Sequence, residues 1–200
     1  MQNSQVLLVG VRHDFEYVIS ANPSALEQEQ RCFFLKRVRE LIRDFNPTVI
    51  ASENRYTNNE ELLTVFGKRL ILIDIPHEER VAKSLHVHRP NAGLALCQCV
   101  DGVREEYWKQ KINDSVRESP VSRVIAFMGA LHLQRFPSRP KSFADLMQTE
   151  GYSVSSIDLT AEPWAKEEWQ WIPSEDHRAQ VSPRPCRLAM GFDSCPDWER

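Results

Sequence analysis

Five short apolar runs divide the chain, and each has the length of a β-strand. They cover residues 5–11, 48–53, 69–75, 123–130 and 152–159. Short runs rich in Val, Ile and Leu, with little polar alternation, are typical of strands that are buried on both faces. Because such strands occur mainly in parallel sheets, we predict a mostly parallel sheet of about five strands.

The segment between the first two runs has helical periodicity. Its apolar residues recur at steps of three and four, which places four of them on one helix face: Phe34, Val38, Leu41 and Phe45. Ser24 and Glu27 have the spacing of a capping box, and Asn46–Pro47 ends the pattern. We therefore predict a long helix here with one buried stripe.

The later connecting segments also indicate helices. The longest spans about residues 77–118, and its predicted buried stripe consists of Leu96, Val100, Val103 and Tyr107. Shorter helices are expected at 60–66 and 141–150. The alternation of strand and helix predicts a three-layer α/β/α fold with right-handed crossovers, whose active edge lies at the carboxyl ends of the strands.

The composition changes after residue 160. Three of the five tryptophans lie close together in this part of the chain, at positions 164, 169 and 171, and prolines recur up to position 196. We predict an α/β core domain over residues 1–160. The remaining residues, 161–200, are predicted to form a Trp/Pro-rich extension that packs on the core or is partly flexible.

A Gly-x-x-His tag follows two of the apolar runs. Gly10 and His13 come after the first run, and Gly129 and His132 come after the fourth. With only 7 glycines and 6 histidines in the chain, chance predicts well under one such pair. We expect each glycine to supply an unusual backbone angle or to let another backbone come close. Each histidine would then point back over the edge of the sheet.

Carboxylates end two further runs. Glu53 closes the second run, and Asp74 lies near the end of the third. Because the carboxyl ends of parallel strands meet at one edge, we expect His13, Glu53, Asp74 and His132 to converge there. Imidazole and carboxylate together suit a divalent ion such as Mn²⁺, Co²⁺ or Zn²⁺.

Composition and motifs exclude several classes of function. The net charge of −3 does not recruit nucleic acid or an anionic membrane, and no apolar run is long enough to span a bilayer. The five cysteines are odd in number and no export signal precedes them, so we expect reduced thiols and a cytoplasmic protein. The glycine-rich dinucleotide motif, the P-loop and the G-x-S-x-G elbow are absent.

These motifs resemble those of the TraB/Tiki superfamily, which also takes in erythromycin esterase and the ChaN-like proteins. The resemblance covers roughly residues 6–160 and rests on few fixed residues. The matching positions are Gly10–His13, Glu53 and Arg55 in VIASENRY, Asp74 and Arg80 after the third run, and Gly129–His132. The chain departs from the family at Val11–Arg12, where members often carry Thr or Glu, and beyond residue 160.

The resemblance implies a hydrolase of small molecules or peptides, in one of two forms. In the metal form, His13, Glu53 and His132 bind a divalent ion with Asp74 nearby, and the ion lowers the pKa of a bound water. In the metal-free form, which the esterase branch implies, a histidine acts as base on water and Glu53 orients it. In both forms, Arg55 or Arg12 steadies an anionic substrate or an oxyanion.

Two other functions stay open from the sequence. ChaN-like members imply binding of haem or iron without turnover, and the same histidine and carboxylate set would hold such a ligand. Alternatively, the chain is an interaction module whose histidines only cap strands or satisfy loop carbonyls. Neither nucleic acid nor a membrane is expected as a partner.

Overall fold

The computed structural model describes residues 4–12, 24–53, 67–76, 79, 94–117, 122–135 and 140–165. The chain divides into two units, residues 1–165 and 166–200, and the second lies outside the described residues. The first unit therefore extends slightly past the predicted boundary at residue 160. The helix predicted over 60–66 also lies outside the described part.

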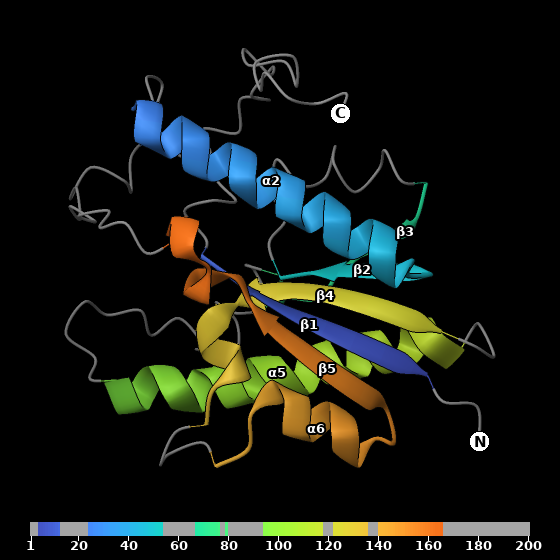
Figure 1. Cartoon of the computed structure of the whole chain (residues 1–200). Helices are drawn as coiled ribbons and strands as arrows, with labels where there is room; N and C mark the ends of the chain where they lie inside the picture. The colour runs from blue at the N-terminus through green and yellow to red at the C-terminus, as the bar shows by residue number, and fades with distance from the viewer. Residues whose placement is uncertain are drawn as a thin grey trace. The chain divides into compact units, whose positions relative to one another are not determined.

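A five-stranded, entirely parallel sheet forms the centre of the first unit (Figure 1). The strand order is β3-β2-β4-β1-β5. The strands are β1 (Gln5–Val11), β2 (Val49–Ser52), β3 (Arg69–Leu72), β4 (Arg123–Gly129) and β5 (Ser153–Asp158). This confirms the predicted α/β class and its parallel sheet, although β2 and β3 are shorter than the apolar runs that contain them.

Helices cover both faces of this sheet. In Figure 1, α2 (Ala25–Phe45) lies over one face, and α5 (Leu94–Arg117) and α6 (Phe143–Thr149) lie over the other. Three short 3₁₀ turns follow the strands: η1 (Ala130–Leu133), η2 (Leu159–Ala161) and η3 (Pro163–Ala165). The connection from β1 to β2 runs toward the β3 edge, whereas those from β3 to β4 and from β4 to β5 run the opposite way. Crossovers of one hand therefore place α2 opposite α5 and α6.

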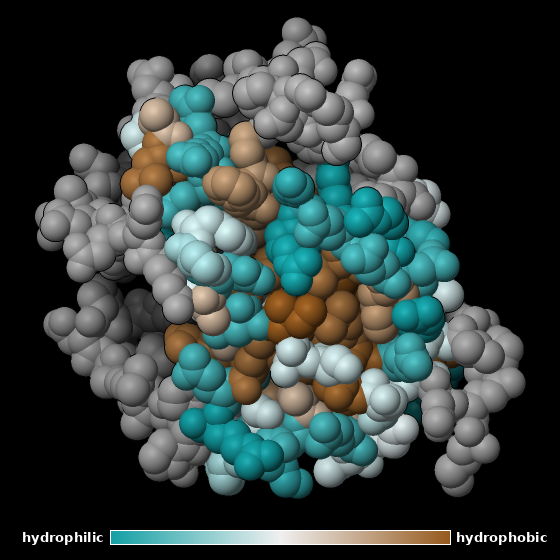
Figure 2. All heavy atoms as spheres, viewed as in Figure 1, coloured by the Kyte–Doolittle hydropathy of each residue, from teal (hydrophilic) through white to brown (hydrophobic). Residues whose placement is uncertain are grey.

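The core consists of side chains from the sheet and from one stripe of each helix. Phe34, Val38 and Ile42 of α2 are buried, as the predicted spacing requires. On the other face, Trp108 and Ile112 of α5 pack with alternate residues of β1 and β4 and with Phe143 and Met147 of α6. In Figure 2, the apolar side chains gather in the centre of the visible face, and hydrophilic side chains surround them.

The buried stripe of α5 differs from the predicted one. Val103, which we expected in the stripe, is 49% exposed. The buried positions are instead Arg104, Glu105, Trp108, Ile112 and Ser115. Tyr107, which we also expected in the stripe, is partly buried and packs against the core, whereas the side chains of Leu96 and Val100 lie outside the described residues. The difference at Val103 arises because two charged residues face the protein, and a pattern of apolar residues cannot reveal this.

The ends of the helices follow the local sequence. Asn46, with φ of 45°, ends α2 in the left-handed region, and Gly151, with φ of 89°, follows α6. Cys32 on α2 takes part in a disulfide bond, which contradicts the expectation that the cysteines are reduced thiols. In the part of the chain that the structure describes, no helix combines the length and apolar character needed to cross a membrane.

Candidate functional site

The two tags follow neighbouring strands at the centre of the sheet. Strands β1 and β4 pair directly, with Val11 opposite Gly129. The chain leaves β1 toward one edge of the sheet and leaves β4 toward the other, so their carboxyl ends flank a topological switch point. Open α/β sheets bind ligands in the crevice at such points.

The first tag packs closely against the second. A Cβ atom at Gly10 would lie 2.7 Å from Leu133 Cδ1 and 3.0 Å from Ala130 Cα. Glycine at position 10 therefore allows η1, which carries His132, to approach the end of β1. This is the close approach that we expected a tag glycine to allow.

His132 is held by two side chains of α5. Its Nδ1 atom lies 2.7 Å from Oε1 of Glu105, and both residues are buried, with exposed fractions of 5% and 1%. The ring of Trp108 meets the imidazole edge-on, with 4.5 Å between the ring centroids. Since Glu105 and Trp108 are three residues apart on one helix, they lie on the same face and both contact the imidazole.

Glu53 connects the ends of two strands to α5. Its backbone N–H donates to the carbonyl of Phe127, which continues the pairing of β2 with β4. Its Oε2 accepts a hydrogen bond from the Gly129 N–H at 2.8 Å, and its Oε1 lies 2.5 Å from Nη2 of Arg104. Glu53 thus fixes the backbone of the second tag.

Asp74 lies just beyond β3 and faces the same arginine. Its Oδ1 accepts hydrogen bonds from Nε of Arg104 at 2.9 Å and from Nε1 of Trp108 at 3.2 Å. Burial acts to lower the pKa of the Arg104 guanidinium, but the Glu53 and Asp74 carboxylates outweigh it and raise the pKa above its ordinary value. Arg104 is therefore a permanent buried cation between the two carboxylates.

The structure brings together three of the predicted site residues. Glu53, Asp74 and His132 all contact the α5 face formed by Arg104, Glu105 and Trp108. His13, Arg55 and Arg80 lie outside the described residues, so their predicted places remain predictions. Arg12 donates from Nη1 to the carbonyl of Ala165 at 3.1 Å, which ties the end of β1 to η3.

Hydrogen-bond donors of the protein engage the two carboxylates that we predicted near a metal, Glu53 and Asp74. Both oxygens of Glu53 and Oδ1 of Asp74 already accept from Arg104, Gly129 or Trp108. The Arg104 guanidinium supplies positive charge to both carboxylates. Within the described residues, no group of three or more potential ligands is arranged to hold an ion.

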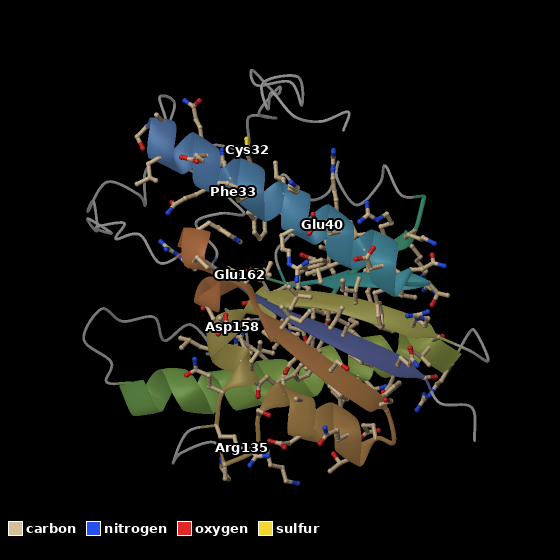
Figure 3. All side chains as sticks on the ribbon, in the orientation of Figure 1. Cys32, Phe33, Glu40, Arg135, Asp158 and Glu162 are labelled. Carbon is tan, nitrogen blue, oxygen red and sulfur yellow. The ribbon has the colours of Figure 1, made fainter. Side chains whose placement is uncertain are left out.

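Sequence reasoning missed the residues that α5 contributes. Arg104 and Glu105 are adjacent charged residues within a polar helix, and such pairs are usually solvated. The spacing of the apolar residues offered one signal. Trp108 and Ile112 are four residues apart, and one more step of four toward the N-terminus places Arg104 on the same helix face. Asp158 at the end of β5, labelled in Figure 3, was also not singled out; its Oδ1 accepts from the N–H and hydroxyl of Thr160, which caps η2.

No protein family, curated protein or solved structure matches this chain in the comparisons with known proteins.

Proposed function

We propose that this protein is a hydrolase of small esters or peptides that works without a bound metal. The observation that carries the proposal is the position of the second tag, since His132 follows β4 at the switch point beside β1. A histidine at this place in an open α/β sheet is suited to general base catalysis.

The proposed reaction is addition of water to an ester or amide carbonyl. His132 takes a proton from water as the water oxygen attacks the carbonyl carbon, and the carbonyl electron pair moves to the oxygen. When the carbon–oxygen double bond re-forms, the leaving group departs and takes the proton from the imidazolium. The products are a carboxylic acid and an alcohol or amine, and His132 returns to its neutral form.

The arrangement of the carboxylates favours the metal-free form of the predicted hydrolase. Glu53 and Asp74 are engaged by Arg104, and Glu53 also holds the Gly129 N–H. We therefore assign Glu53 the role of fixing the end of β4, so that η1 presents His132 correctly. His13 and Arg55 keep their predicted roles as a second imidazole and as a partner for the oxyanion.

A panel of chromogenic esters and labelled peptides tests the proposal, with elemental analysis of the same protein. We expect turnover to survive exhaustive chelation and to fall by about 10²–10⁴-fold in His132→Ala, because the general base is lost. Gln134→Ala is the matched control, since Gln134 is an exposed residue directly after η1. It should retain full activity.

Three results would overturn the proposal. Activity that disappears on chelation and returns with Mn²⁺, Co²⁺ or Zn²⁺ would restore the metal form. Equal activity in His132→Ala and the unmodified chain would remove the assigned base. Absence of hydrolysis across the panel, with a haem absorbance band on reconstitution, would favour the ligand-binding function.

A further inference from the structure

We propose that Glu105 is the positioning residue of this site, because it holds His132 in one tautomer and one orientation. The inference deepens the proposed function, on which its catalytic part rests. Our sequence interpretation gave the orienting role to Glu53. The geometry gives it to a carboxylate from a different element, the helix α5.

The two carboxylates near His132 have different partners. Glu53 is held by Arg104 and by the Gly129 N–H, so it acts on the backbone that leads to the histidine. Glu105 lies one position further along α5 and makes the contact with the imidazole itself, 2.7 Å from Nδ1. One turn of α5 therefore acts on both ends of the second tag. Arg104 holds Glu53, which binds the Gly129 N–H, and Glu105 contacts His132 directly.

The chemistry of the contact fixes the position of a proton. In the proposed arrangement Glu105 is an ionised carboxylate, which only accepts hydrogen bonds, and the Nδ1 atom of His132 carries the hydrogen. In the neutral ring, Nε2 is then the nitrogen with the lone pair, which is the form that a general base requires. Because both groups are buried, this hydrogen bond is stronger than it would be in water.

Trp108 completes the restraint on the ring. It meets His132 edge-on, and its own indole N–H is tied to Asp74 at 3.2 Å. The ring of Trp108 also packs against Phe143 of α6 and is fully buried. The imidazole is thus held by a hydrogen bond at one nitrogen and by an aromatic contact, and both come from α5.

Nuclear magnetic resonance of ¹⁵N-histidine-labelled protein tests this assignment without a substrate. The His132 signals are identified by their loss in His132→Gln, and spectra are recorded at a pH where the imidazoles are neutral. We expect the unmodified chain to show the Nδ1–H tautomer. In Glu105→Met, which keeps the size of the side chain but removes the acceptor, we expect a mixture dominated by the Nε2–H form of free histidine.

The helix provides a matched control next to the tested residue. Glu106 is exposed and pairs with Lys109, so Glu106→Met should leave the tautomer of His132 unchanged. Glu105→Gln is a second variant with the same shape, in case Glu105→Met does not fold; its amide accepts or donates, so we expect a partial shift toward the mixture.

Kinetics on a hydrolysed ester add the functional part. We expect Glu105→Met to lower kcat by about 10²-fold or more with little change in KM. The substitution places the hydrogen on the nitrogen that should act as base, but it does not remove a contact with the substrate. An Nε2–H tautomer in the unmodified chain would overturn the inference, as would an unchanged tautomer in folded Glu105→Met and Glu105→Gln. If the tautomer shifts as expected but no substrate is turned over, the hydrolase proposal fails while the role of Glu105 in holding His132 stands.

Discussion

The glycines of the two tags meet different structural demands. Gly129 has φ of −55° and ψ of 133°, which any residue adopts, and its N–H donates to Glu53. Gly10 is also absent from the described residues with positive φ, but a Cβ there would meet η1 at 2.7–3.0 Å. Of the two reasons we gave for a tag glycine, close approach therefore applies at Gly10, and an unusual backbone angle applies at neither.

A substitution at Gly10 tests this explanation. We expect Gly10→Ala to lower the free energy of unfolding by about 1–3 kcal/mol, because the added methyl group overpacks against Ala130 and Leu133. Gly102→Ala in α5 is the control, since a Cβ there meets nothing within 4 Å. It should raise stability by about 0.5–1 kcal/mol, as is usual for glycine inside a helix. Urea unfolding of both variants gives the comparison, and equal effects would contradict the packing argument.

At the scale of elements, the sequence predicts strands and α2 well and the inner face of α5 poorly. The inner strands β1, β2 and β4 are apolar because they are buried on both faces, whereas the edge strands β3 and β5 are partly exposed. Phe34 and Val38 mark the inner side of α2. The described inner side of α5 includes Arg104 and Glu105, whose burial depends on partners from the strand ends and from η1. The pattern of apolar residues along a helix cannot show that a charged residue is buried when its partner of opposite charge comes from a distant part of the chain.

The start of α6 provides a test of element stability with pH. Ser142 and Asp145 form a reciprocal capping box, and Asp145 also binds Arg135 with both oxygens. The hydrogen bond from Arg135, followed by that from the Ser142 N–H, lowers the pKa of Asp145 below its ordinary value of 3.8. A lowered pKa in the folded state stabilises the fold above pH 3.8, and this contribution is lost as pH falls below that value.

We therefore expect Asp145→Asn to cost about 1 kcal/mol near neutral pH, a typical value for a helix cap. The difference from the unmodified chain should begin to shrink as pH falls below 3.8, because the unfolded chain then takes up a proton that folded Asp145 does not. It should vanish only when the folded carboxyl is protonated as well. Urea unfolding at several pH values measures this change. Arg135→Met removes one of the two partners of Asp145 and keeps Ser142, so it should lose only part of this pH-dependent stabilisation. If the difference in stability between Asp145→Asn and the unmodified chain stays constant with pH, the role assigned to the Asp145 carboxylate is wrong.

At the scale of the whole first unit, parallel strands with intervening helices were predictable because buried strands and helix periodicity are local signals. The convergence of Glu53, Asp74 and His132 was also predictable, since parallel strands share a carboxyl edge. What joins these residues was not predictable. Arg104 comes from the middle of a helix that packs under the sheet, and its partners lie 51 and 30 residues away in sequence.

This buried ion network links α5 to the strands, and its removal should destabilise the entire unit. We expect Arg104→Met to lower the free energy of unfolding by about 3–5 kcal/mol, because it removes the positive charge that Arg104 places beside the buried carboxylates of Glu53 and Asp74. Adding Glu53→Gln should recover part of that loss, since a neutral amide still accepts from the Gly129 N–H.

Arg117→Met is the control on the same helix. Arg117 is exposed and its ion pair with Asp114 is long at 3.5 Å, so its loss should cost less than about 1 kcal/mol. Urea unfolding measures all three variants. If Arg104→Met and Arg117→Met cost the same, the guanidinium does not hold the carboxyl edge together, and the case against a metal at Glu53 and Asp74 is lost with it.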